Sequence, residues 1–381
     1  MTEALTRLVG EPTEFLASSF GRRPVHRPAA GGSFDDLLTL TDVDHIVADG
    51  GLRAPAFRLV REGRTLPRAD VTRRARIGSR PVDDLVDVAA VHREFEHGAS
   101  IVLQGLHRSW PAVAALCRSL EVSLTHPVQA NAYLTPPVAQ GLDLHADPHD
   151  VFVVQTHGTK RWVVHPPDGS AAWDLQLGRG DVLYLPAGTR HAAQTVDEPS
   201  LHLTIGVRTV DRRDVLRALL DQHLGDARFA APLPGGWADR PDAVAASLRE
   251  DLAALIADLA DADPMEAVTD AAASFWTGRV PDRTGGLLDV LDVGRLDDRT
   301  WLRRRADATA RLTVDDRQVT LHLADRRLEL PATAATVLHD VLGRDRFRPA
   351  DLAATADETS RRVLCARLVR EGLLTIDRDG A

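Results

Sequence analysis

The stretch between residues 151 and 207 contains short apolar runs separated by turns rich in Pro and Gly. The runs are residues 151–154, 162–164, 182–185 and 201–207. Strands of this length, closely spaced and bounded by turn formers, are typical of a β-sandwich or β-barrel of the jelly-roll kind. We therefore expect a closed or two-layered β core in the middle of the chain.

Residues suited to metal binding lie among these runs. His145 and Asp147 are two positions apart, and side chains two apart on a strand project to the same face. His191 follows the 182–185 run and a Pro-Ala-Gly turn, which would bring its side chain back over the sheet. Two His and one carboxylate, with the opposite positions open, form the metal site of non-haem Fe(II) oxygenases. With 15 His in the chain a His-x-Asp pair also arises by chance, so this prediction depends on the surrounding strands.

Lys160 is the only lysine in a chain that has 46 Lys and Arg residues together. An ammonium is a compact point charge, whereas a guanidinium is a wide planar fork. A narrow pocket for one end of a dicarboxylate therefore favours Lys at this position. The alternative is that one lysine has survived here by drift.

Further residues recur in a fixed order through the same stretch. They are Asn131, Tyr133, Thr135-Pro136-Pro137, Gln140-Gly141, His145, Asp147, Asp150, Phe152, Gln155, Gly158, Lys160, Trp162, residues 180–186, His191, Ser200, His202 and Thr204. This pattern resembles the JmjC-type 2-oxoglutarate oxygenases, and most closely the ribosomal oxygenase branch, which hydroxylates protein side chains.

The resemblance implies an α+β protein with a double-stranded β-helix core of the jelly-roll, cupin/JmjC type. It places that core, with a helical lead-in, at residues 1–208. A helical domain at 209–300 and a winged-helix-like domain at 301–381 would follow.

The resemblance also implies roles for single residues. His145, Asp147 and His191 would hold Fe(II), and Lys160 would bind the far carboxylate of the cosubstrate 2-oxoglutarate. Three further side chains would line the cosubstrate pocket: Asn131, Tyr133 and Thr204. The expected reaction uses O2 and hydroxylates a side chain of a protein substrate.

The sequence leaves the substrate open. A formal net charge of −9 argues against general nucleic-acid binding and suits a basic partner such as a ribosomal protein. In the resembling family, histidine hydroxylases tend to carry Lys at the position of Lys160 and bacterial arginine hydroxylases Arg. The chain departs from the family in a shorter segment after Pro166-Pro167, so the same chemistry on a peptide or small metabolite stays an alternative. Lysine demethylation, a cupin hydrolase or isomerase, and a non-catalytic cupin binding or regulatory protein are the others.

The flanking regions give coarser expectations. Residues 82–95 and 111–120 have helical spacing around a strand at 100–106, and residues 211–275 predict two helices divided by the break at 232–236. In the resembling family the latter region forms a homodimer contact, although such helices can also simply pack on the barrel.

The last third predicts a hairpin at 310–323, helices at 332–342, 349–353 and 358–372, and a strand at 373–376. Acidic residues offset the arginines of the last helix, which favours a protein-contact or packing module over a DNA reader.

Composition indicates the compartment. The only two cysteines, Cys117 and Cys365, are far apart and fall in helical patterns, which fits unpaired thiols in a reducing cytoplasm. No run has the roughly 18 apolar residues of a membrane span. We expect a cytoplasmic protein.

Overall fold

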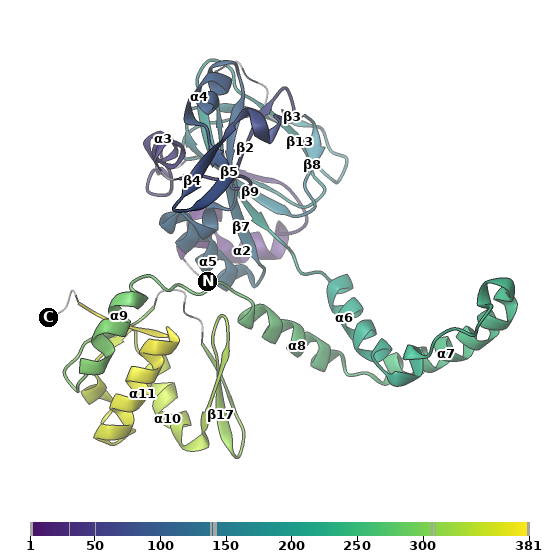
Figure 1. Cartoon of the computed structure of the whole chain (residues 1–381), viewed down its shortest axis with the longest axis vertical. Coiled ribbons are helices and arrows are strands. Elements are labelled where there is room, and N and C mark those ends of the chain that lie inside the picture. The colour runs from purple at the N-terminus through teal and green to yellow at the C-terminus, as the bar shows by residue number, and fades with distance from the viewer. Residues whose placement is uncertain are drawn as a thin grey trace. The chain divides into compact units, whose positions relative to one another are not determined.

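The computed structural model describes residues 3–29, 31–49, 51–137, 139, 143–305, 308 and 310–378. The chain forms two compact units, residues 1–209 and 210–381 (Figure 1). Gln140-Gly141, part of the family pattern, lies outside the described residues. The finer division into three domains stays a prediction.

Two antiparallel sheets form the β core of the first unit. The larger has the order β1-β12-β9-β14-β7-β6-β2-β3 and the smaller the order β11-β10-β13-β8. The larger sheet consists of β1 (Val25–Arg27), β2 (Phe57–Arg61), β3 (Arg64–Thr65), β6 (Ser100–Leu103), β7 (Val128–Thr135), β9 (Asp150–His157), β12 (Val182–Leu185) and β14 (Ser200–Val207). The smaller consists of β8 (His145–Ala146), β10 (Lys160–His165), β11 (Trp173–Leu177) and β13 (Arg190–Gln194). All the apolar runs between 151 and 207 therefore lie in strands.

The central strands are apolar because both of their faces are buried. On β9, Phe152 and Val154 pack into a core beneath the sheet, while Val151 and Val153 pack with Trp162 of the smaller sheet. Strands that are covered on both sides read as continuous apolar runs rather than as an alternating pattern. β9 thus links the helical layer of the first unit to the space between the two sheets.

Helices cover the outer face of the larger sheet. Leu5, Phe15 and Leu120 join its side chains in the largest core cluster. The helices of this unit are α1 (Glu3–Val9), α2 (Pro12–Ser18), α3 (Leu40–Ala48), α4 (Val88–Glu96) and α5 (Pro111–Leu124), with short 3-10 turns η1 (Arg68–Asp70) and η2 (Leu106–Arg108). A hairpin of β4 (Thr72–Ile77) and β5 (Arg80–Val86) precedes α4.

The helix expected from residue 82 begins later. Val82, Leu85 and Val86 have helical spacing, but the backbone of this segment pairs with β4, as in the Thr72–Val86 pair. Asp87 then caps α4, because its side chain accepts a hydrogen bond from the Ala90 amide. The spacing alone could not reveal the pairing, so the prediction was wrong at residues 82–86.

The second unit begins with helices that hold few buried residues. They are α6 (Arg212–Leu224), α7 (Pro241–Asp261) and α8 (Pro264–Thr277), with η3 (Ala227–Ala230) and η4 (Trp237–Asp239) between the first two. The sequence predicted two helices here rather than three. The second break arises because Asp263 caps a new helix and Pro264 begins it, a pair of signals that the apolar periodicity hides. Nowhere in the described ranges is a helix long and apolar enough to cross a membrane.

The rest of the second unit packs around its own core, which includes Leu302, Leu338, Phe347 and Leu368. Its helices are α9 (Gly286–Asp292), η5 (Val293–Arg295), η6 (Ala332–Ala334), α10 (Ala335–Leu342), η7 (Pro349–Leu352) and α11 (Glu358–Glu371). One sheet is β19 (Arg346–Phe347), β15 (Leu302–Arg304) and β20 (Leu374–Ile376), and the other is β16 (Arg311–Val314), β17 (Gln318–His322) and β18 (Arg327–Pro331). The expected hairpin is the β16–β17 pair, which β18 extends.

Gly158, in the turn before β10, lies where the backbones of two segments approach closely. Its φ is +62°, and a Cβ there would overlap the backbone carbonyl of Pro199. Gly169 has a similar φ of +76° but open space around it. We expect Gly158→Ala to lower the free energy of unfolding by roughly 3 kcal/mol and Gly169→Ala by about 1 kcal/mol. Urea unfolding of both variants measures the difference, and equal losses would contradict the overlap.

Candidate metal centre and its cavity

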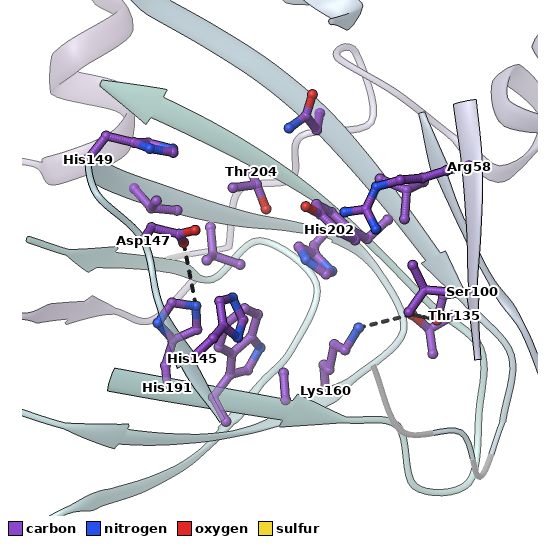
Figure 2. Close-up of a pocket in the computed structure, with 18 residues that line it drawn as sticks. Arg58, Ser100, Thr135, His145, Asp147, His149, Lys160, His191, His202 and Thr204 are labelled. Atoms are coloured by element: carbon purple, nitrogen blue, oxygen red, sulfur yellow. Dashed lines mark hydrogen bonds and ion pairs between the residues drawn. The ribbon is translucent and has the colours of Figure 1, made fainter. Parts of the chain in front are cut away.

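Three potential metal ligands converge at one end of the first unit. β8 and β13 pair so that His145 lies opposite His191, and Asp147 follows directly after β8. Ligand atoms of these three residues lie within 4.8 Å of one another, and His191 Nε2 is 3.6 Å from Asp147 Oδ2 (Figure 2). The structure thus gathers the predicted triad from segments that are distant in sequence.

Backbone carbonyls orient both imidazoles. His145 Nδ1 lies 2.7 Å from the Asp143 carbonyl oxygen, and His191 Nδ1 lies 2.9 Å from that of Thr189. Each Nδ1 can donate to its carbonyl, which leaves both Nε2 atoms as free acceptors beside the carboxylate. Burial lowers the pKa of His191 and so favours the neutral, metal-binding form. The donor set and its hydrogen bonds therefore fit a divalent transition metal.

The triad lines a cavity of about 180 Å³ between the two sheets. The floor of the cavity is one face of the larger sheet, where paired residues of neighbouring strands lie side by side. Arg58 pairs with Val102, Val102 with Tyr133, and Tyr133 with His202. Because alternate residues of a strand share a face, the side chains on one face of these strands all point into the cavity. All the residues predicted for the site line it: His145, Asp147, His191, Lys160, Asn131, Tyr133 and Thr204.

Lys160 is almost fully buried in the wall of this cavity. Its Nζ donates to Thr135 Oγ1 at 2.9 Å, and Ser100 Oγ donates to the same oxygen at 3.1 Å. No carboxylate among the described residues pairs with it, and burial lowers its pKa to about 7. An unneutralised buried cation is costly, so this wall is suited to receive an anion.

Aromatic rings hold a second buried imidazole on the floor. His202 stacks on Tyr133 with ring centroids 5.0 Å apart and meets Trp162 edge-on at 5.6 Å. Burial, followed by the charge of Lys160, lowers the pKa of His202 well below its usual value, so its ring is neutral. His202 Nδ1 and Trp162 Nε1 are buried without a hydrogen-bond partner among the described residues. The floor therefore still offers polar atoms to a bound molecule.

Several cavity residues had no predicted role. Thr135, Trp162 and His202 matched the family pattern, and a role in the pocket could have been inferred from their alternation with apolar neighbours. His149 also lines the cavity, outside the metal triad. Arg58 gave no signal, because it lies on β2 far from the motif.

Residues 107–172 and 165–215 match the family described as "JmjC domain". The chain therefore contains a JmjC-type domain at residues 107–215.

Relatives of the chain include the "bifunctional lysine-specific demethylase and histidyl-hydroxylase NO66" of two animals. The Drosophila simulans protein is 34% identical over 138 residues, which cover 31% of this chain and 16% of that protein. The Branchiostoma floridae protein is 31% identical over 199 residues, 48% of this chain and 32% of that protein. The chain thus spans at most about a third of these relatives.

Solved structures match along almost the whole length of the chain. YcfD, a ribosomal oxygenase from Escherichia coli, in complex with cobalt and succinic acid, has a TM-score of 0.57 at 16% identity, over 97% of this chain and 99% of that one. Its complex with cobalt and 2-oxoglutarate gives 0.55 at 17% identity, with the same coverage. This likeness confirms the predicted JmjC/cupin-type fold.

The metal centre generates a direct binding prediction. We expect His145→Ala to weaken Co(II) binding at least ~100-fold, because it removes one of three ligands from a site with few protein donors. His149→Ala is the matched control, since His149 lines the same cavity outside the triad and should leave the affinity within twofold. Titration followed by the visible absorption of Co(II) measures both, and equal affinities in the two variants would contradict the assignment.

Proposed function

We propose that this chain is an Fe(II)- and 2-oxoglutarate-dependent oxygenase that hydroxylates a side chain of a protein substrate. One observation carries the proposal: the triad of His145, Asp147 and His191 shares a cavity with an unpaired buried lysine. A metal site and a separate anion site in one enclosed space are what this reaction requires. The YcfD structures, which hold cobalt with succinic acid or 2-oxoglutarate, support the proposal.

Each residue then has a defined task. The triad holds the metal, which with 2-oxoglutarate and O2 supplies the chemistry that hydroxylates an unactivated C–H bond. Lys160 binds the far carboxylate of the cosubstrate, and the Thr135 hydroxyl holds its ammonium in place. The enclosing strands exclude water, which strengthens these charge interactions.

The remaining predicted residues line the floor beside this anion site. Asn131 Oδ1 accepts from the Gly105 amide at 2.9 Å, which fixes the side-chain amide in one orientation. Thr204 lies opposite Asn131 in the β7–β14 pair. Burial raises the pKa of Tyr133, so its hydroxyl stays protonated. We assign all three to contacts with the cosubstrate.

The names of the relatives support a protein substrate. NO66 is named for histidyl hydroxylation and lysine demethylation, and YcfD is a ribosomal oxygenase. We therefore favour a side chain of a ribosomal protein, which suits the net charge of −9. The complete set of ligands and the buried lysine weigh against the non-catalytic alternative, and the relatives weigh against a small metabolite.

Exposed apolar residues on the helices of the second unit support homodimer formation. Leu248, Leu252 and Ile256 recur every four residues along α7, and each is more than half exposed. Residues at this spacing form one stripe on a helix, and a helix leaves such a stripe in water only at an energetic cost. A second copy of the chain is the occupant we propose.

The C-terminal part is proposed to be a winged-helix-like module that contacts protein rather than DNA. On α11, Arg361 pairs with Asp298, Arg362 with Glu358 at 3.5 Å and Arg367 with Glu371 at 2.7 Å. Arginines engaged in this way are poor phosphate ligands.

Both cysteines are free and buried, which supports the proposed location in a reducing cytoplasm.

Turnover tests the proposed activity. Purified protein with Fe(II), ascorbate and 2-oxoglutarate should form succinate without added substrate, and His145→Ala should abolish this. Lys160→Ala should raise the apparent KM for 2-oxoglutarate roughly 10- to 100-fold, because a charge-assisted hydrogen bond contributes about 1.5–3 kcal/mol. His149→Ala serves as the control for a change in the cavity. Absence of both binding and consumption of 2-oxoglutarate by wild type would refute the proposal.

The pKa of Lys160 predicts a pH dependence of cosubstrate binding. Burial lowers this pKa from 10.5 to about 7, so the ammonium is present below pH 7 and is lost as the pH rises. A bound carboxylate stabilises the ammonium, so binding should take up most of a proton at pH 8 and little at pH 6. Calorimetry of the Mn(II)-loaded protein in two buffers counts these protons. Lys160→Arg should take up none at either pH, and equal uptake by wild type at both would contradict the assignment.

The size of the protein in solution tests the proposed dimer. Light scattering should give twice the chain mass for wild type and the chain mass for Leu252→Glu with Ile256→Glu. Val314→Glu, a similar change at an exposed apolar residue of β16, should leave the mass unchanged. A monomeric wild type would refute the dimer.

The proposed absence of DNA binding can be tested by size-exclusion chromatography. Addition of duplex DNA at low salt should not change the elution volume of the protein.

A further inference from the structure

A second cation enters the cavity from outside the matched JmjC segment. Arg58 lies on β2, and its side chain lines the cavity across from His145 and His191 (Figure 2). Its Nε donates to Gln104 Oε1 at 3.0 Å and its Nη1 donates to Thr65 Oγ1 at 3.1 Å. These two bonds fix the plane of the guanidinium, and the hydroxyl of Tyr133 is a further neutral partner beside it.

Arg58 has only neutral partners. Nearly every arginine ion pair in the first unit, such as Arg61 with Glu94 at 2.8 Å, lies on its outer surface. Within the described residues, Arg58 pairs with no carboxylate, although it lies in a partly enclosed space where an unneutralised charge is costly. The guanidinium is thus held in position but not neutralised.

The charges of the cavity leave Arg58 in excess. Asp147 is the single carboxylate among the described residues that line it. Under the proposed function, on which this step rests, a divalent metal is balanced by doubly charged 2-oxoglutarate, and Asp147 is balanced by Lys160. One positive charge then remains at Arg58, and a rigid guanidinium fork is complementary to a carboxylate.

The position of Arg58 relative to the metal ligands is also constrained. Gly63, in the turn between β2 and β3, approaches Asp143 so closely that a Cβ on it would come within 2.5 Å of the Asp143 carboxylate. The carbonyl of Asp143 is the acceptor that orients His145. The hairpin that carries Arg58 therefore packs on the segment that leads into the metal site.

We propose that Arg58 binds a carboxylate of the protein or peptide substrate, separate from the 2-oxoglutarate carboxylate at Lys160. The substrate would then carry an acidic side chain or a chain end close to the residue that is hydroxylated. Such a contact selects a local acidic group even within a partner that is basic overall.

Binding of small probes to protein loaded with Mn(II) and 2-oxoglutarate tests the proposal. The probes are N-acetylglutamate amide and its neutral isostere N-acetylglutamine amide, and Mn(II)-enhanced proton relaxation detects even weak binding in the cavity. Wild type should bind the glutamate probe at least tenfold more tightly than the glutamine probe. Arg58→Gln should abolish that preference, and Arg58→Lys, which keeps the charge, should retain part of it.

Controls separate this inference from the function on which it rests. Arg64→Gln, an exposed change on β3 of the same hairpin, should keep the wild-type preference. Failure of wild type to bind 2-oxoglutarate would refute the proposed function itself. If 2-oxoglutarate binds but wild type shows no preference, or Arg58→Gln keeps it, the inference is wrong. A tenfold loss of 2-oxoglutarate affinity in Arg58→Gln would also overturn it, because Arg58 would then bind the cosubstrate.

Discussion

The antiparallel pairing of β14 with both β7 and β9 positions most of the cavity floor. It places Thr204 opposite Asn131 on one side and Val153 on the other. Alternate residues of β14, such as Leu203 and Ile205, pack into the helical core instead. A shift of one residue would exchange these two sets, so burial of the apolar set holds the polar set in the cavity. Apolar packing on one face of the sheet thereby fixes the positions of the polar side chains on the other face.

The positive side chains inside the cavity differ from those on the surface in their partners. The protein uses Arg nearly everywhere, and its arginines pair with carboxylates at many surface positions. Its one lysine is enclosed, and its hydrogen-bond partner among the described residues is the Thr135 hydroxyl. The same space contains Arg58 with neutral partners and a triad with a single carboxylate. Positive groups therefore outnumber carboxylates in this cavity. The positions of Lys160 and Arg58 indicate where the negative groups of bound molecules would lie.

Local sequence was enough to predict part of this arrangement. The triad of potential metal ligands followed from a two-residue spacing, a turn and flanking apolar strands, and the residues proposed to contact the cosubstrate followed from the family pattern. Arg58 could not be found in this way, because β2 reaches the cavity only by pairing with β6, about 40 residues further along the chain. The helix expected at residues 82–86 failed for the same reason, since strand pairing overrode helical spacing. The prediction missed the third helix of the second unit because it relied on the periodic spacing of apolar residues. The start of this helix is marked instead by the N-cap residue Asp263 and by Pro264.

The enclosure of Lys160 has a consequence for how long the folded chain survives. Burying its ammonium without a counter-ion opposes folding, whereas a dicarboxylate that binds only the folded form offsets that cost and stabilises it by mass action. Proteases attack chains that have opened, and the population of opened chains falls as the folded form is stabilised. A bound dicarboxylate would thus protect the folded chain from proteolysis.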